Sequence, residues 1–187
     1  MTTNLFTGKQ IRLTAEDPKV MAKAFANWNL DSEYSRLLDS DPLHLWSEKQ
    51  FKDWFEKDLE KENPNHISFM IRTLDSEKPI GFVALFDLYW NHGDALIGIG
   101  LGERDYWGNG YGTDAMKTLQ RYAFTEMNLR RLTLVVFDYN PRAIRSYEKC
   151  GFVKEGTVRG VILREGRRWD WHHMGILKEE WEQTIEK

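Results

Sequence analysis

The segment 104–113, RDYWGNGYGT, constrains the fold most, because it stands where a strand pattern changes into a helix pattern. An apolar run precedes it, and the run 114–127 follows it with four apolar residues on one helical face: Met116, Leu119, Ala123 and Met127. Glycine alternates in the loop, at Gly108, Gly110 and Gly112. Glycine lets the backbone turn sharply and approach a ligand closely. The amide groups of the next helix's first turn then point out of the loop, at the positive end of the helix dipole, where phosphate groups bind.

The spacing of these glycines disfavours the two commonest phosphate-binding loops. It does not match the G-x-G-x-x-G fingerprint of dinucleotide-binding domains. The loop also lacks the Lys-Ser or Lys-Thr pair that ends a nucleoside-triphosphate loop. A tight turn and a phosphate site therefore both remain open interpretations of the loop alone.

A second motif follows at a short distance along the chain. The β-rich run 131–138, RLTLVVFD, leads into 139–152, YNPRAIRSYEKCGF. Asn140 and Pro141 are typical of a helix start, with asparagine as the N-cap and proline at the first helical position. Three residues share one face of this short helix: Ala143, Ile144 and Tyr147. Gly151 ends the helix, and Phe152 follows it.

Together the two motifs resemble those of the GCN5-related N-acetyltransferases (the GNAT family). The matching segments are YWGNGYGTDA and NPRAIRSYEKCGF, in the family's order, and the resemblance is densest over residues 95–152. The chain looks most like the RimJ/RimL-type branch, which acetylates the N-termini of ribosomal proteins and to which spermidine acetyltransferases are also similar. The resemblance implies acetyl-CoA as the cosubstrate. It also implies a central sheet that splays in the middle and admits the pantetheine arm of acetyl-CoA.

The remaining chain reads as further strands and helices of an α+β fold. Strands are predicted at 9–13, 66–74, 79–90, 95–101, 131–138, 158–163 and 169–177. Helices are predicted at 17–29, from Ser47 onward with a capping box to Gln50, at 114–127 and from Pro141, while 31–46 reads as irregular or short-helical. Together these elements predict a mixed, mostly antiparallel sheet with helices on both faces. No linker or repeat interrupts it, so the prediction is a single domain over residues 1–187.

The resemblance assigns cofactor-binding roles to residues of both motifs. The loop and helix start would hold the pyrophosphate of the cofactor through backbone amides: Gly108, Asn109, Gly110, Tyr111, Gly112 and Thr113. The backbone of the preceding strand would pair with the pantetheine amides: Ile99, Gly100 and Leu101. Asn140 and Ile144 would contact the cofactor as well, although Asn140 also has the simpler role of an N-cap. Trp107 stands where the family usually carries glutamine or arginine, a departure that the RimJ/RimL branch shares.

The resemblance implies one catalytic residue and leaves another unassigned. Tyr147 would be the general acid that protonates the departing CoA thiolate, and its alternative role is that of a buried core aromatic. Leu96 stands where relatives commonly carry an acidic residue, so it cannot be the general base. Four nearby residues remain candidates for that role: Asp87, His92, Asp94 and Asp138. Cys150 reads as a small packed residue rather than a nucleophile.

The composition limits the compartment, the metal content and the partners that are expected for this chain. No apolar run is long enough to span a membrane, and the N-terminal residues lack a signal-peptide core. A single cysteine fits a reducing compartment, which predicts a cytoplasmic protein. Clustered cysteine and histidine are lacking, so no metal site is expected. The formal net charge of −3 gives no sign of the basic surface that nucleic-acid-binding proteins carry, so no nucleic-acid partner is expected. A homodimer remains possible.

The predicted function is direct acetyl transfer from acetyl-CoA to a primary amine, with the α-amino group of a protein or peptide as the first candidate. A small amine such as a polyamine or an antibiotic is an alternative acceptor, and a non-catalytic CoA-binding sensor is an alternative of another class. Residues 28–46 and the final hairpin near Trp169 and Trp171 are expected to set acceptor selectivity. Acidic residues there would favour a cation or would simply be surface residues: Glu33, Asp39 and Asp41.

Overall fold

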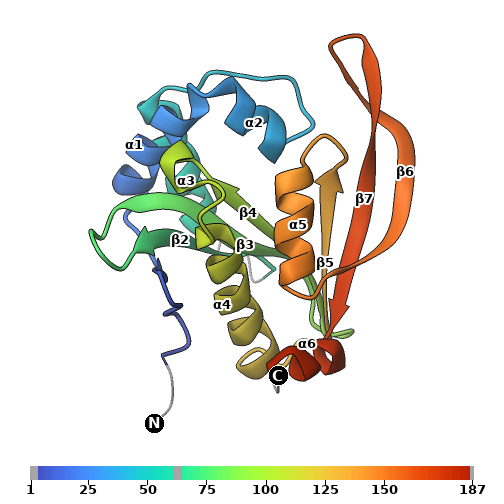
Figure 1. Cartoon of the computed structure of the whole chain (residues 1–187). Coiled ribbons are helices and arrows are strands. Elements are labelled where there is room, and N and C mark those ends of the chain that lie inside the picture. The colour runs from blue at the N-terminus through green and yellow to red at the C-terminus, as the bar shows by residue number, and fades with distance from the viewer. Residues whose placement is uncertain (1–3, 61–64, 186–187) are drawn as a thin grey trace.

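The computed structural model describes residues 4–60 and 65–185, and a mixed sheet forms its centre (Figure 1). The strands are β1 (Ile11–Thr14), β2 (Ile67–Thr73), β3 (Pro79–Tyr89), β4 (Asp94–Leu101), β5 (Arg131–Phe137), β6 (Val153–Arg164) and β7 (Arg167–Leu177). Their order in the sheet is β1-β2-β3-β4-β5-β7-β6. Every neighbouring pair is antiparallel except β4 and β5, which run parallel. The predicted mixed, mostly antiparallel sheet is confirmed.

Helices connect and cover these strands. They are α1 (Pro18–Asn29), α2 (Ser32–Leu38), α3 (Glu48–Glu60), α4 (Tyr111–Thr125), α5 (Pro141–Lys149) and α6 (Lys178–Ile185), with a short 3₁₀ turn at Arg104–Tyr106. The predicted capping box is present at the start of α3, where the Gln50 Oε1 atom accepts a hydrogen bond from the Ser47 amide at 3.0 Å and the Ser47 Oγ atom accepts one from the Gln50 amide at 3.3 Å. Among the described residues, no helix combines the length and apolar character that crossing a membrane requires.

The sheet opens between its two halves. β4 and β5 pair only from Asp94–Arg131 to Leu96–Thr133, at the beginning of both strands. Beyond that point the strands diverge, so the edge of β4 that faces β5 carries backbone groups without a ladder partner at residues 97–101. The predicted splay in the middle of the sheet is confirmed, and it exposes one strand edge at the centre of the fold.

Both faces of β4 are covered by helices. On one face, a Cβ on Gly102 would lie 2.0 Å from the Trp28 ring of α1, so glycine is what lets α1 approach the strand. On the other face, Leu101 points toward the first turn of α4, where a Cβ on Gly112 would lie 3.2 Å from its Cδ1 atom. Figure 1 shows α1, α2 and α3 gathered at one end of the sheet and α4 and α5 in front of it.

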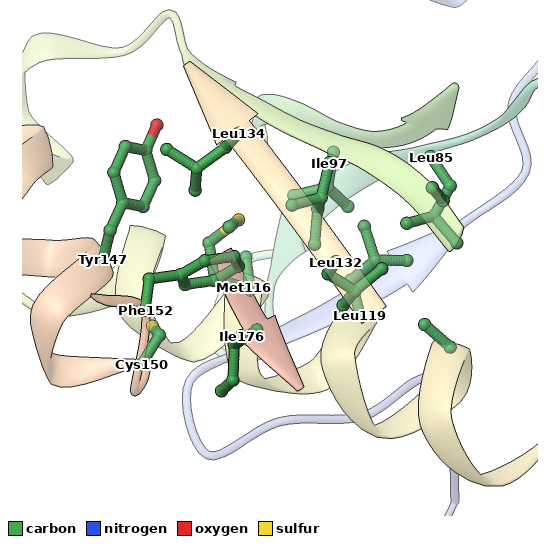
Figure 2. Close-up of a cluster of buried hydrophobic side chains, with 14 of the residues drawn as sticks. Leu85, Ile97, Met116, Leu119, Leu132, Leu134, Tyr147, Cys150, Phe152 and Ile176 are labelled. Atoms are coloured by element: carbon green, nitrogen blue, oxygen red, sulfur yellow. The ribbon is translucent and has the colours of Figure 1, made fainter. Parts of the chain in front are cut away.

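The main core lies between α4 and the sheet and joins the two halves. Figure 2 shows residues of this cluster from both motifs and from β3 and β7: Leu85, Ile97, Met116, Leu119, Leu132, Leu134, Phe152 and Ile176. All are buried to 3% exposure or less. This packing fixes α4 and α5 against the diverging strands, and Tyr147 and Cys150 lie at the edge of the cluster.

Two element starts and one helix are the main departures from the sequence prediction. The helix predicted from residue 114 begins at Tyr111, because Gly110 adopts a left-handed conformation with φ 89° and turns the chain directly into α4. The strand predicted at 158–163 already begins at Val153, where it pairs with β7. Helix α6 was not predicted, and its one buried residue, Trp181, packs on Phe124 at 5.2 Å between ring centroids.

Asp114 anchors the start of α4 to the N-terminal strand. Its carboxylate accepts hydrogen bonds from the backbone amides of Lys9, Gln10 and Ile11 at 3.0, 2.7 and 3.2 Å. Hydrogen bonds to a charged group contribute about 1.5–3 kcal/mol each, so Asp114→Ala is expected to lower the free energy of unfolding by about 2–4 kcal/mol. Urea denaturation measures the change.

A matched control lies on the same helix. Glu126 is exposed at the end of α4, so Glu126→Ala is expected to leave the denaturation midpoint unchanged. Equal stability of Asp114→Ala and Glu126→Ala would contradict the anchoring role of Asp114.

Candidate functional site

A cleft of about 320 Å³ opens where β4 and β5 diverge. Its walls come from the exposed end of β4, the first turn of α4, the inner side of α5 and one side of α2. The two sequence motifs therefore meet in one cavity, although Gly112 and Asn140 are 28 positions apart in the chain. The predicted residues that line it are Ile99, Gly100, Leu101, Gly108, Gly110, Gly112, Thr113, Asn140 and Tyr147.

The first turn of α4 presents free amide groups to this cleft. Gly110 precedes the helix as its N-cap, and no side chain caps the amides that follow. The first helical bond runs from the Asp114 amide to the Gly110 carbonyl at 2.9 Å, so the amides of residues 111–113 have no partner within the helix. Helix amides of this kind, at the positive end of the dipole, suit an anionic group such as a pyrophosphate.

The α5 side of the cleft carries a stripe of positive charge. Arg142, Arg145 and Lys149 line it at helical spacing. No aspartate or glutamate is among its lining residues in the described part of the chain. Three cations beside a row of free amides favour a ligand with several phosphate charges. The spacing of the basic residues in 141–149 is visible in the sequence and is the signal that could have predicted this stripe.

Trp107 closes the end of β4 and supports one of these cations. Its Nε1 group donates a hydrogen bond to the Leu101 carbonyl at 2.7 Å. The Arg142 guanidinium stacks on its ring at 3.8 Å from the centroid, and Arg104 stacks at 4.9 Å. Burial lowers the pKa of Arg142, which remains a charged group at neutral pH. A tryptophan here thus positions an arginine at the cleft.

Asn140 starts α5 at the wall of the cleft. Its Oδ1 atom accepts a hydrogen bond from the Ala143 amide at 3.2 Å, so the predicted N-cap is confirmed. The side chain is also largely buried and lines the cleft, which leaves its amide group beside any ligand held there.

Tyr147 points from α5 into the same cavity. Its ring packs against Phe152 at 6.1 Å between centroids. Figure 2 shows its hydroxyl pointing away from the cluster of Cys150, Phe152 and Ile176. Burial, chiefly, raises the pKa of Tyr147 above its ordinary value, so the phenol keeps its proton at neutral pH. The ring is therefore part of the core, and the protonated hydroxyl lies at the cleft.

Three of the predicted cofactor ligands do not line the cleft with their side chains. The Asn109 amide turns back to the Asp105 carbonyl at 2.9 Å. Tyr111 packs edge to face on Tyr106 at 5.0 Å. Ile144 packs against the main core. For the first two, contact with a ligand would have to come from the backbone.

The candidates for a general base lie elsewhere. Asp94 pairs with Arg130 at 3.1 Å, and Asp138 lies 3.2 Å from the His172 Nε2 atom. Asp87 and His92 are exposed near the β3–β4 turn. None of the four lines the cleft. Among the described residues, no group of three or more histidine, cysteine, aspartate or glutamate side chains could hold a metal ion.

Cys150 is not a nucleophile in this arrangement. It is buried behind α5, and its sulfur lies 3.6 Å from the Thr113 carbonyl. Burial raises the pKa of the Cys150 thiol to about 12, so it carries no thiolate at neutral pH. The predicted packing role fits this position.

The β6–β7 turn is tied to α2, across the opening from α5. Arg36 pairs with Glu165 at 2.5 Å, and Arg164 donates a hydrogen bond to the Asp39 carbonyl at 2.6 Å. Residues 28–46 and the final hairpin are therefore in contact, but no hairpin residue lines the cleft, and a part for the hairpin in acceptor selectivity stays a prediction. Trp169 and Trp171 do not line the cleft, whereas Tyr34, Leu37 and Leu38 of α2 do.

The comparison with protein families gives a match over most of the chain. The model of the acetyltransferase (GNAT) domain matches residues 11–153. A SPbeta prophage-derived, uncharacterised N-acetyltransferase of Bacillus subtilis is 29% identical, and the match covers 97% of this chain and 98% of the relative's chain. The spermidine N(1)-acetyltransferase of Vibrio cholerae is 30% identical, and the match covers 73% of this chain and 80% of the relative's chain. A putative ribosomal N-acetyltransferase of Bacillus subtilis is 30% identical, and the match covers 54% of this chain and 55% of the relative's chain.

Solved structures share the fold. The crystal structure of spermidine N-acetyltransferase from Vibrio cholerae, in complex with CoA and spermine, superposes with a TM-score of 0.80. The two chains are 24% identical, and the match covers 92% of this chain and 98% of the other. At this identity the likeness concerns the architecture.

Proposed function

The chain belongs to the acetyltransferase (GNAT) family, and we propose that it moves the acetyl group of acetyl-CoA onto the α-amino group of a protein or peptide. The protein is an N-acetyltransferase, and acetyl-CoA is its cosubstrate. The observation that carries the proposal is the cleft at the sheet's opening, which joins free helix amides, an α5 cation stripe and the Tyr147 hydroxyl. We expect it in a reducing compartment, the cytoplasm, because its cysteine is a free, buried thiol.

We assign the binding of the cofactor phosphates to the first turn of α4 and to α5. The amides of residues 111–113 and the side chains of Arg142, Arg145 and Lys149 face the same space. The unpaired edge of β4 at 97–101 would pair with the pantetheine amides as an added strand. This arrangement would hold the thioester at the opening between the strands, close to Tyr147.

In the proposed reaction the protein holds two substrates, acetyl-CoA and the amine, and supplies one proton. The amine nitrogen, as its neutral form, bonds to the carbonyl carbon of the acetyl group, and the carbon–sulfur bond breaks. Tyr147 gives its phenolic proton to the departing sulfur and afterwards recovers one from the amine side or from water. The group that first deprotonates the ammonium stays unassigned, since no carboxylate lines the cleft among the described residues.

A second acceptor class, the polyamines, has a specific observation in its favour. The spermidine acetyltransferases share sequence with this chain over most of its length. The RimJ/RimL branch has support from the putative ribosomal acetyltransferase, which matches about half of the chain. Direct transfer to an amine is common to both acceptors, and they differ in the group that must fit beside the amine.

A thiol-release assay with wild-type protein tests this proposal. We expect release of CoA thiol that depends on a free peptide α-amino group, and mass spectrometry should find the acetyl group on the first residue. The same peptide with a blocked N-terminus is the control and should release none. Binding of acetyl-CoA without thiol release from any amine would instead identify a CoA-binding sensor and contradict the proposed transfer.

A further inference from the structure

A second cavity, of about 350 Å³, lies on the α1–α3 side of the sheet. We call it the aromatic recess, because rings from three helices, a loop and β3 line it: Phe25, Tyr34, Trp46, Phe51, Trp54 and Phe82. The rings pack on one another, with centroids 5.2 Å apart for Trp46 and Phe51 and for Phe25 and Phe82.

The aromatic recess adjoins the cofactor cleft. Tyr34 and Leu38 line both cavities. The Tyr34 hydroxyl lies 3.0 Å from the position that a Cβ on Gly100 would occupy, on the central strand β4. A group held in the recess would therefore reach the thioester side of β4 past Tyr34.

The Tyr34 hydroxyl marks this junction as a polar point in an apolar wall. The side chain is 6% exposed, and its oxygen has no hydrogen-bond partner among the described atoms. Burial raises the pKa of Tyr34, so the group is a neutral donor and acceptor at working pH. An unpartnered buried hydroxyl is costly unless a ligand satisfies it, and an amine or an amide of a bound acceptor can do so.

The interior of the recess offers apolar surface. Trp46 and Trp54 remain 39% and 46% exposed, although both are large rings at the cavity. Exposed aromatic surface gathered around a concave site is typical of a ligand-binding pocket. Such a surface gains free energy by taking an apolar group out of water.

Negative charge is confined to the outer edge of the recess. Asp39 and Asp41 line it from the loop after α2, and both are exposed. Glu33, which was expected to meet a cation, instead pairs with Arg104 at 2.7 Å and does not line the recess. A polyamine carries charge along its whole length, whereas this cavity has carboxylates at one side and aromatic rings elsewhere.

We infer that the aromatic recess holds the apolar side chain of the acceptor, which makes the preferred substrate a peptide whose N-terminal residue is large and apolar. This inference rests on the proposed acetyl transfer and adds the chemical class of the acceptor. The side chain lies among Phe25, Phe51 and Trp46, and the α-amino group lies at Tyr34 beside β4. The peptide beyond its first residue leaves past the exposed loop 39–46.

Wild-type selectivity is the first test. Three amines are compared at saturating acetyl-CoA: a short peptide with N-terminal phenylalanine, the same peptide with N-terminal alanine, and spermidine. Burial of a phenylalanine side chain favours binding by about 1.5–3 kcal/mol, so we expect kcat/KM for the phenylalanine peptide to exceed that for the alanine peptide by about 10- to 100-fold. Spermidine should be the poorest of the three.

Trp46→Ala tests the recess itself. The Trp46 backbone amide is held by the Asn29 Oδ1 atom at 2.8 Å, so the loop keeps this anchor when the ring is removed. We expect kcat/KM for the phenylalanine peptide to fall about tenfold, with the alanine peptide and the KM for acetyl-CoA unchanged. Trp54→Ala, on α3, provides an independent second variant. Trp90→Ala is the matched control, since Trp90 is 53% exposed and lines neither cavity.

The outcomes separate the two proposals. Faster acetylation of spermidine or of the alanine peptide than of the phenylalanine peptide would overturn the inference while the proposed transfer stands. Equal effects of Trp46→Ala and Trp90→Ala on selectivity would overturn it as well. If no amine of any kind is acetylated by protein that binds acetyl-CoA, the proposed function itself fails, and the inference fails with it.

Discussion

Gly112→Val is expected to raise the dissociation constant for acetyl-CoA by about 100-fold or more. Gly112 lies in the first turn of α4, and a Cβ there would point at β4, 3.2 Å from the Leu101 Cδ1 atom and 3.7 Å from the Ile99 Cδ1 atom. The two methyl groups of valine would fill the space between the helix start and the strand, so a phosphate could no longer reach the amides. Two lost charge-assisted hydrogen bonds correspond to an effect of this size.

Isothermal titration with acetyl-CoA measures this loss, and a thermal melt shows that the variant is folded. Gly110→Val would test the same loop less cleanly, because Gly110 has φ 89° and any side chain there strains the backbone. Gly166→Val controls for that strain, since Gly166 has φ 72° at the β6–β7 turn with open space around it. Normal binding of acetyl-CoA by folded Gly112→Val would refute the phosphate site.

Tyr147→Phe is expected to lower turnover by about 10²–10⁴-fold and to leave the affinity for acetyl-CoA nearly unchanged. The substitution keeps the ring, which packs against Phe152 and the main core, and removes only the hydroxyl at the cleft. Stability should therefore stay close to that of the wild type. Steady-state turnover with saturating amine and acetyl-CoA measures the effect, after a viscosity test has shown that chemistry limits the rate.

The pH dependence gives the Tyr147 assignment a second readout. Because burial raises the pKa of Tyr147, its protonated, acid form persists from neutral pH into the alkaline range. Turnover should therefore rise as the amine loses its proton, with no decline near pH 10 where an ordinary tyrosine titrates. Tyr122→Phe on α4 is the control, since that ring packs on Phe6 and Phe69 outside the cleft. Unchanged turnover in Tyr147→Phe would leave Tyr147 as a core residue alone.

Local signals in the sequence predicted most of the elements that frame the cleft. Asn140 and Pro141 gave the start of α5, and Ser47 with Gln50 gave the start of α3, because caps depend on neighbouring residues. The start of α4 was placed three residues late, since alternating glycines conceal where helical geometry begins. Helix α6 was missed because its anchor is the tertiary contact between Trp181 and Phe124.

The site was predictable where it depends on strand–loop–helix order and not where it depends on packing between distant segments. Gly108, Gly112 and Asn140 were placed by their motifs, and they line the cleft. Tyr34 lies in the segment 31–46, which was predicted as irregular or short-helical, and its contact with Gly100 arises only from the docking of α2 on β4. The aromatic rings of the recess carry no joint signal, since they come from α1, α3, β3 and a loop.

The order of the last strands affects how the site is assembled during synthesis. β7 lies between β5 and β6, so β5 gains its antiparallel neighbour only when residues 167–177 have left the ribosome. Helix α5, with Asn140 and Tyr147, ends 28 residues before that neighbour is complete. The half of the sheet beside α5 therefore closes last, and a nascent chain has the glycine loop before α4 well before the cleft between the two halves is complete.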